Sequence, residues 1–281
     1  EAYDVAEFEW LCQYLAESYE VLPLVELQQR LSSRRPPSGA VALTFDDGYA
    51  DNLELGLPVL RRYRLPATVF VTTGVIGGQR HLWTSRLAWI IEHGRLSDGA
   101  VEACGLTLRL DGVSQRVETL DRLTERLKRV AQGQREEIIA RLQQQLAVED
   151  LSGLEGEMLS WDQLREMDAA GFAAEAHTVT HPILAETDDE QLEVEILGCK
   201  EELEGRLGRK VRAFAYPNGM PEDYDRRAVE LLRRGGYQTA VTTIFGANGS
   251  ATDPLQLRRV SCYAPTRAGV ALQTERFFYH T

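Results

Sequence analysis

Short apolar runs alternate with longer amphipathic stretches along most of the chain. The short runs are rich in β-branched and small apolar residues, as buried strands are; they span residues 41–45, 67–72, 172–176, 211–216, 239–243 and 257–262. Polar and apolar residues recur with a helical period at 53–63, 160–171, 188–208 and 223–236. Strands that alternate with helices predict βα units, a largely parallel sheet and the α/β fold class.

The region from about residue 95 to 155 interrupts this alternation. The stretch 106–118 predicts a β-hairpin, because Asp111-Gly112 suits its tight turn. Two charged amphipathic helices are expected to follow, through 127–130 and over 136–146. We interpret the region as an insertion that shapes substrate access or pairs with another subunit.

Composition narrows the class of protein. The 281 residues are 43% hydrophobic and 26% charged, which is ordinary for a globular chain. The net charge of −12 is dispersed, and no basic cluster of the kind that binds nucleic acid is present. The four cysteines lie far apart, so we expect single packing thiols rather than a disulfide framework or a zinc knuckle. No apolar run approaches the roughly 20 residues of a membrane helix.

Polar residues with catalytic potential follow two of the predicted strands. In parallel α/β proteins, functional groups gather at the carboxyl ends of the strands. Asp46 and Asp47 stand directly after the first strand, and Gly48 provides the backbone freedom for a turn. Two adjacent carboxylates repel each other, so a cation or a catalytic task would explain them. A plain strand-to-helix turn with an Asp N-cap is the simpler alternative.

The sequence "HTVTH" places His177 and His181 four residues apart, again after a predicted strand. On one helical turn these positions project from the same face, which is a common arrangement for a divalent metal. The alternative is a surface turn that ends at Pro182. One carboxylate and two imidazoles would form the ligand set of a catalytic zinc, with one coordination position left for water.

Three motifs in order carry a resemblance to a known family. "TFDDG" at 44–48, "HTVTH" at 177–181 and "FAYPNG" at 214–219 each lie at or after a predicted strand. The sequence around the first two motifs is also similar to that of the same family. The chain from about 41 to 262 thereby resembles the polysaccharide deacetylase family (NodB homology, carbohydrate esterase family 4). The resemblance implies a distorted (β/α)7 barrel with a hairpin-plus-helices insertion. We accordingly expect a helical segment at 1–40 that packs on the barrel, and the barrel itself at 41–281.

The resemblance also implies a reaction and its residues. Asp46 matches the family's catalytic base, and Asp47, His177 and His181 match its metal ligands. The implied cofactor is one divalent ion, Zn²⁺ before Co²⁺, Ni²⁺ or Mn²⁺. The implied activity is removal of N-acetyl groups from an acetamido sugar in a polysaccharide, oligosaccharide or glycolipid. Water activated by the metal attacks the acetyl carbonyl while Asp46 accepts its proton, and a backbone N–H of the 216–219 turn stabilises the oxyanion.

Aromatic residues near these motifs suggest a substrate surface. With the family resemblance, the turn at Tyr216, Pro217 and Asn218 is expected to form one wall of a sugar groove. Tyr216 would stack on a sugar face, and Asn218 would donate its backbone N–H. Trp83 also follows a strand and is predicted to stack on a sugar ring.

The chain departs from the family at two points. Many members carry an arginine that orients the catalytic aspartate, where this chain has Ala215. Arg258 or Arg259 is a candidate replacement, and we place Arg259 among the residues that face the substrate. A surface charge and an ordinary salt bridge are the simpler interpretation of this pair.

The second departure concerns the general acid. Family members often protonate the leaving amine with a histidine from a late motif, but the only late histidine here is His280 in "RFFYHT". His81 lies on the expected active face and is an outside candidate, whereas His93 is expected at a helix end or on the surface. The acid is therefore left unassigned.

Two other functions compete with the deacetylase. A hydrolase of a cyclic amide would keep the fold and metal, but its relatives commonly depart from the Asp-Asp and His-x-x-x-His set. A catalytically weak glycan-binding module would fit the missing acid. The expected partner is an N-acetylated glycan or glycolipid, with no nucleic acid, no transmembrane segment and an open oligomeric state. No signal peptide is recognisable at residues 1–10, so bacterial cytoplasm and cell envelope or periplasm both stay open.

Overall fold

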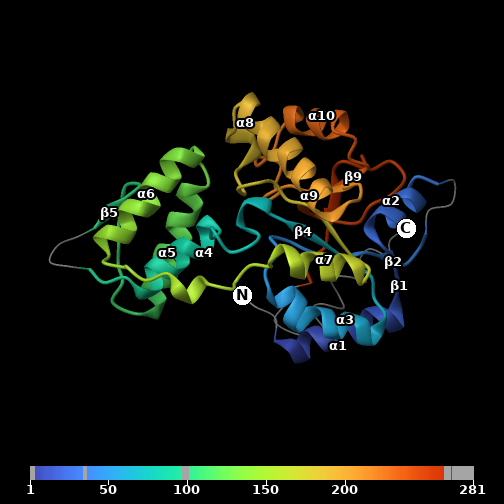
Figure 1. Ribbon diagram of the computed structural model, residues 1–281, viewed down its shortest axis with the longest axis horizontal. Helices are drawn as coiled ribbons and strands as arrows, with labels where there is room; N and C mark the ends of the chain where they lie inside the picture. Colours follow the sequence, from blue (N-terminus) through green and yellow to red (C-terminus); the bar gives the residue numbers. More distant parts are fainter. Residues whose placement is uncertain (1–3, 34–36, 97–100, 263–266, 268–281) are drawn as a thin grey trace.

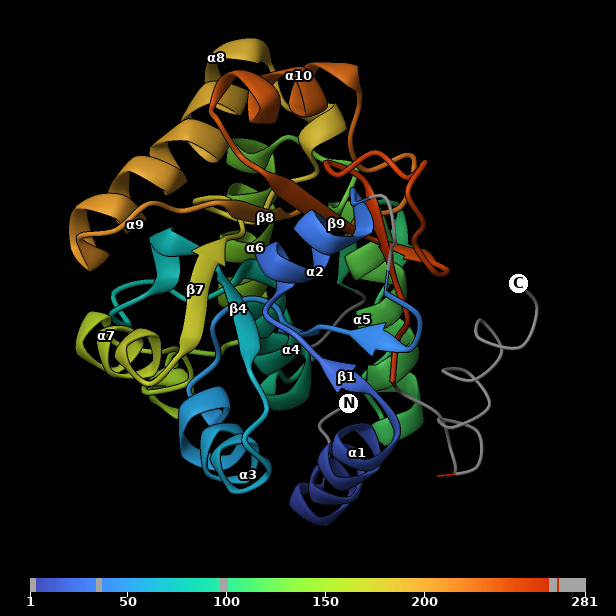
Figure 2. The ribbon, with the colours of Figure 1, turned by 90° about the vertical axis from the view of Figure 1, so that its right-hand side faces the viewer.

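The computed structural model describes residues 4–33, 37–96, 101–262 and 267. Its centre is a six-stranded, all-parallel sheet that curves into a half-barrel (Figure 2). In spatial order the strands are β10 (Leu257–Arg259), β9 (Thr239–Phe245), β8 (Ala213–Ala215), β7 (Phe172–Ala176), β4 (Ala67–Val71) and β3 (Leu43–Phe45). The predicted parallel sheet is confirmed, and all six strands lie within or overlap the predicted runs.

Helices cover the outer face of this sheet. They are α3 (Leu57–Tyr63), α7 (Trp161–Ala169), α8 (Asp189–Glu193), α9 (Cys199–Leu207) and α10 (Arg226–Arg234). Helix α7 begins at a capping box, in which the Ser160 side chain accepts from the Gln163 N–H and the Gln163 side chain accepts from the Ser160 N–H. Two predicted helices contain π-helical segments, Asn52–Gly56 before α3 and Val194–Gly198 between α8 and α9.

The inserted region and the helix before it fold together around a hydrophobic cluster separate from that of the barrel. Helices α4 (Trp83–His93), α5 (Val113–Leu127) and α6 (Gln132–Gln145) form a lobe beside the barrel (Figure 1). The cluster at its centre is made of aliphatic side chains at most 1% exposed: Leu87, Ile90, Ile91, Leu123, Leu127, Ile139, Leu142 and Leu146.

The predicted hairpin at 106–118 is wrong. The hairpin instead joins β5 (Glu102–Ala103) to β6 (Leu106–Thr107) through Cys104-Gly105, and Gly112 is the N-cap of α5. From residue 113 onward the chain is helical, because the helical period buries Thr119, Leu123 and Leu127 on one face. A hairpin strand at 113–118 would not bury these residues.

The N-terminal residues pack beside the open edge of the half-barrel. Helix α1 (Val5–Ser18) contacts α3, and α2 (Leu24–Leu31) follows the short strand β1 (Glu20–Val21). Strand β1 pairs with β2 (Ala40–Val41), so the predicted single strand 41–45 is divided between two sheets.

Three short 3-10 helices complete the described chain: Thr73–Val75, Ser152–Leu154 and Leu184–Glu186. All four cysteines are free thiols, as predicted. Over the described ranges, no helix combines the length and the apolar character that crossing a bilayer requires.

The register of the sheet brings the ends of four strands to one pole. Phe45 pairs with Val69, Val71 with Ala176, and Ala215 with Val241. The residues that follow these strands therefore gather at one pole, although those after β3 and those after β7 are more than 100 positions apart in the sequence.

Gly74 stands where this pole is most crowded. Its N–H donates to the Val179 carbonyl at 2.8 Å, and a Cβ at Gly74 would lie 2.4 Å from that oxygen. We predict that Gly74→Ala lowers the free energy of unfolding by about 1–3 kcal/mol, because the backbone itself must move. The matched control is Gly205→Ala in α9, where a Cβ meets nothing within 4 Å. It should be neutral or stabilising by up to about 1 kcal/mol. Urea unfolding of both variants checks this, and equal stabilities would contradict it.

Candidate active site

The two adjacent carboxylates are separated by an unusual backbone turn. Asp47 adopts a left-handed conformation (φ 71°), as does Gly48 (φ 91°). A Cβ at Gly48 would lie 3.0 Å from the side chains of Val71 and Ile76. Both this crowding and the left-handed backbone favour glycine at the position. Successive strand residues point to opposite faces, but this turn sends both carboxylates to the same pole of the sheet. The turn at Gly48 was predicted; the left-handed Asp47 was not.

Asp47, His177 and His181 converge on one point. The Asp47 Oδ1 atom lies 3.4 Å from the Nε2 atom of each histidine, and one ligand atom from each residue lies within 4.8 Å of the other two. Ligands 2.0–2.1 Å from a tetrahedral metal are about 3.3 Å apart. The Asp47 Oδ1 atom is buried, and no described residue hydrogen bonds to it. An orphaned carboxylate oxygen between two imidazoles fits a divalent ion with three protein ligands.

The fully buried His177 ring is fixed by the neighbouring strand. Its Nδ1 lies 2.7 Å from the Ala215 carbonyl oxygen at the end of β8. A carbonyl only accepts, so Nδ1 carries the proton and the Nε2 lone pair faces Asp47. Burial lowers the pKa of His177, but the Asp47 carboxylate 3.4 Å from its Nε2 and the charge of Asp46 raise it above its ordinary value. Burial dominates at His181 and lowers its pKa to about 4, so this imidazole is neutral at pH 7.

The two histidines do not lie on a helical turn, which corrects the interpretation of their spacing. They occupy an irregular loop after β7 in which Thr178 (φ 67°) and His181 (φ 57°) are left-handed. Hydrogen bonds to the chain beyond β4 fix this loop: Thr73 N–H donates to Thr178 O at 3.1 Å, and Gly74 N–H to Val179 O at 2.8 Å. The histidines therefore converge through neighbouring backbone rather than through a helical period.

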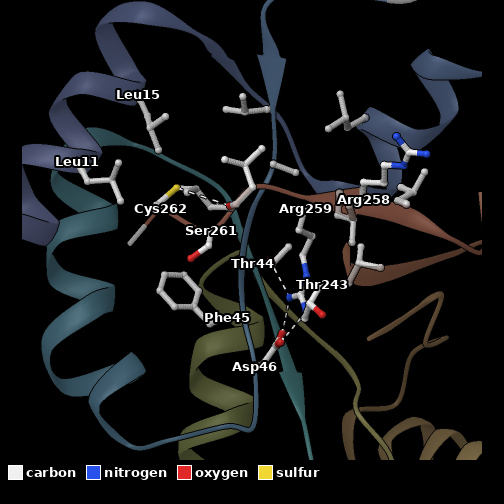
Figure 3. Close-up of a pocket in the computed structure, with 18 of the residues that line it drawn as sticks. Leu11, Leu15, Thr44, Phe45, Asp46, Thr243, Arg258, Arg259, Ser261 and Cys262 are labelled. Atoms are coloured by element: carbon white, nitrogen blue, oxygen red, sulfur yellow. Dashed lines mark hydrogen bonds and ion pairs between the residues drawn. The ribbon is translucent and has the colours of Figure 1, made fainter. Parts of the chain in front are cut away.

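Arg259 pairs with the carboxylate of Asp46 (Figure 3). Its two terminal nitrogens lie 2.8 Å from the two Asp46 oxygens, and its Nε donates to the Thr242 carbonyl at 2.7 Å. Burial raises the pKa of Asp46, but the charge and hydrogen bonds of Arg259, together with the nearby His177 and His181, outweigh it and the pKa falls to about 2. The structure thus places Arg259 on Asp46, with its donors directed at protein acceptors rather than at a substrate surface. Arg258, the other candidate, is exposed.

Two predicted sugar-stacking residues are buried, so these predictions are wrong. Tyr216 has no exposed surface: its hydroxyl donates to the Leu255 carbonyl at 2.8 Å and its ring stacks on Tyr224. Trp83 is 4% exposed and packs in the insertion's cluster, where the Arg135 guanidinium lies 4.6 Å from its ring centre. Sequence alone did not reveal that both rings face inward.

The turn after β8 offers one backbone donor. Tyr216 N–H donates to Val241 O, Pro217 is buried and has no N–H, and Gly219 N–H donates to Pro217 O. Asn218 is half-buried and left-handed (φ 58°), and no acceptor in the described chain takes its N–H. The backbone donor predicted at Asn218 is therefore available. It lies three residues after Ala215, whose carbonyl accepts the hydrogen bond from the His177 ring.

Neither of the two described candidates for the general acid is hydrogen bonded to this constellation. His81 is half-buried, and among the described residues no hydrogen bond joins it to Asp46, Asp47, His177 or His181. His93 is exposed at the end of α4, as expected. His280 lies outside the described residues.

A cavity of about 700 Å³ adjoins Asp46 and Arg259. Figure 3 shows Leu11 and Leu15 of α1 and Phe45 of β3 around it. Its walls are mainly aliphatic, so Asp46 and Arg259 form a charged patch at the side of an apolar space.

Comparisons with known proteins agree on one family. Residues 33–240 match the family model described as polysaccharide deacetylase. A curated relative, the putative polysaccharide deacetylase YxkH of Bacillus subtilis, is 36% identical over 90 residues. That alignment spans 31% of this chain and 32% of the relative, so it covers about a third of the relative's length.

Solved structures share the fold at low sequence identity. The deacetylase PplD of Streptococcus pyogenes in complex with acetate superposes with a TM-score of 0.63 and 21% identity, over 98% of this chain and 89% of that one. IcaB from Ammonifex degensii gives 0.62 and 20% identity, over 97% and 88%. The polysaccharide deacetylase BC0361 of Bacillus cereus gives 0.58 and 20% identity, over 98% and 65%. These likenesses support the barrel fold.

The Asp46–Arg259 pair is testable by its effect on stability. We predict that Arg259→Met lowers the free energy of unfolding by about 2 kcal/mol, less than the 3–5 kcal/mol of a fully buried pair because both side chains are partly exposed. Adding Asp46→Asn should recover part of this loss, since no unpaired carboxylate then remains. Arg258→Met is the exposed control. Urea unfolding at pH 7 checks the cycle, and additive effects of the two substitutions would refute the pairing.

Proposed function

The chain belongs to the polysaccharide deacetylase family, and we propose that it is a metal-dependent hydrolase that removes N-acetyl groups from an acetamido sugar. The observation that carries this proposal is the convergence of Asp47, His177 and His181, with orphaned Asp47 Oδ1 between two imidazoles. Beside them stands Asp46, a carboxylate that Arg259 keeps ionised. The proposed substrate is an N-acetylated glycan or glycolipid.

Asp47, His177 and His181 would hold one divalent ion. Two imidazole nitrogens and one carboxylate oxygen suit Zn²⁺, and they also accept Co²⁺, Ni²⁺ or Mn²⁺. When bound, such an ion acts as a Lewis acid that polarises the acetyl carbonyl and makes water acidic enough to react near neutral pH. The buried hydrogen bond from His177 to Ala215 fixes the tautomer that presents Nε2 to the ion.

Asp46 would accept the proton of the attacking water. Its low pKa keeps it unprotonated at neutral pH, and its bidentate pairing with Arg259 orients the carboxylate. General-base assistance of this kind contributes about 10²–10⁴-fold to the rate. The N–H of Asn218, which no acceptor in the described chain takes, would stabilise the negative charge that develops on the acetyl oxygen.

Because Asp46 and Asp47 have different proposed roles, their substitution should affect metal content differently. Asp46→Asn should retain bound metal but lose about 10²–10⁴-fold in acetate release, because proton acceptance is lost while the ligands remain. Asp47→Ala and His177→Ala should lose the metal. Glu54→Gln, an exposed acid in the π-helical segment Asn52–Gly56 that does not line the cavity, is the matched control. Elemental analysis after dialysis and acetate release from a panel of N-acetylated oligosaccharides would report both properties. Full metal content and activity in Asp47→Ala would overturn the assignment.

Metal removal provides a second, independent prediction. Treatment with a strong chelator should abolish acetate release, and added Zn²⁺ or Co²⁺ should restore it, because the ion would polarise the acetyl carbonyl and acidify the attacking water. A glycan-binding module would instead bind the oligosaccharide with or without chelator and release no acetate. Chelator-insensitive acetate release would contradict the metal mechanism.

A further inference from the structure

Glu195 is a carboxylate in an unusual position. Its exposed fraction is 0%, and it lies in the π-helical segment Val194–Gly198 on the outer layer of the barrel. A fully buried carboxylate is expensive unless its oxygens are satisfied by hydrogen-bond donors. No motif of the sequence points to this residue.

The hydrogen bonds of Glu195 lead to the loop between the two metal-site histidines. Its Oε2 accepts the backbone N–H groups of Val179 at 2.8 Å and Thr180 at 2.9 Å. Its Oε1 accepts the Thr180 hydroxyl at 2.6 Å and the Gln191 amide at 3.1 Å. Three of the four donors thus come from two consecutive residues between His177 and His181.

This loop needs external support. The left-handed backbone of Thr178 and of His181 is unfavourable for non-glycine residues, and such strain persists only where the surroundings hold it. Thr73 and Gly74 bind the carbonyls of Thr178 and Val179 on one side. Glu195 binds the N–H groups on the other side, so the loop is held by both its carbonyls and its amides.

The insertion contributes a positive charge near the same place. The buried Arg135 of α6 is close enough to Glu136 and Glu195 to interact with their negative charges, and its guanidinium lies over the Trp83 ring. The Trp83 indole in turn donates to the His181 carbonyl at 3.4 Å. A buried anion and a buried cation therefore flank the histidine loop from the barrel and from the inserted lobe.

We propose that Glu195 is a positioning residue that sets the loop geometry in which His177 and His181 converge on Asp47. This inference rests on the proposed metal-dependent function. Glu195 touches neither the ligand atoms nor the expected substrate space; it acts through the backbone of Val179 and Thr180. Removing an outer-shell partner of a metal site typically costs about 10–100-fold in metal affinity.

The test is Glu195→Gln, which keeps the size of the side chain but turns one oxygen into an N–H donor. At least one of the loop's donors then faces another donor instead of an acceptor. We expect the Zn²⁺ dissociation constant, measured by competition with a chromogenic chelator, to rise about 10–100-fold. The visible spectrum of the Co²⁺ form should also change, because the ligand geometry relaxes.

The matched control is Glu193→Gln, two residues earlier and exposed, where the carboxylate forms a 3.8 Å ion pair with Arg234. Its dissociation constant should stay within about twofold of the wild-type value. Thermal unfolding of the metal-free proteins establishes that both variants fold. A folded Glu195→Gln protein with wild-type affinity and an unchanged Co²⁺ spectrum would overturn the inference.

A second variant covers the case in which Glu195→Gln does not fold. Thr180→Val removes the hydroxyl bond to Oε1 but keeps both backbone bonds, so it should weaken Zn²⁺ binding in the same direction by a smaller factor. Unchanged affinity in folded Thr180→Val would then count against the inference.

Amide exchange separates the inference from the proposed function. In the metal-free protein, exchange of the Val179 and Thr180 amides should be faster in Glu195→Gln than in wild type. If the wild-type protein binds no metal, the proposed function fails, while this readout still decides whether Glu195 holds the loop. If wild type binds metal and Glu195→Gln shows neither faster exchange nor weaker binding, the positioning role alone fails.

Discussion

The site depends on keeping two adjacent carboxylates apart at the end of one strand. Two unit charges 4 Å apart interact by about 4 kcal/mol at the effective dielectric of a protein surface, so Asp46 and Asp47 would disfavour each other if they shared one environment. The left-handed backbone of Asp47 gives them different ones. Asp46 meets the guanidinium of Arg259, and Asp47 meets the two imidazoles that complete a metal-ligand set.

The half-barrel makes this division possible. The carboxyl ends of β3, β4, β7 and β8 meet at one pole, which brings Asp47 beside His177 and His177 beside the Ala215 carbonyl. Strands β3 and β10 are the two edges of the sheet, and Arg259 of β10 bonds to Asp46 just after β3. One ion pair therefore joins the two edges of the open sheet and also orients the proposed base.

The fold class and the principal motifs were predictable from the sequence, because periodicity and order along the chain are one-dimensional signals. The parallel sheet and the grouping of the two aspartates with His177 at its carboxyl pole follow from such signals. Orientation is not one-dimensional. Tyr216 follows a strand as an exposed groove residue would, yet its ring turns into the core.

Contacts between distant segments were the least predictable part. Sequence left Arg258 and Arg259 as equal candidates, and only the three-dimensional path of β10 directs Arg259 at Asp46. Glu195 carried no signal, because its partners are backbone N–H groups, which every residue but proline possesses. The histidine spacing suggested a helical turn, although hydrogen bonds from Thr73 and Gly74 shape an irregular loop instead.

The most direct measurement is a crystal structure of the Zn²⁺-loaded protein with anomalous diffraction recorded at the zinc edge. The account predicts one strong peak about 2.0–2.2 Å from Asp47 Oδ1 and from the Nε2 atoms of His177 and His181. It also predicts that Asp46 stays unligated and paired with Arg259. A peak that includes Asp46 as a ligand, or no peak among these three side chains, would contradict it.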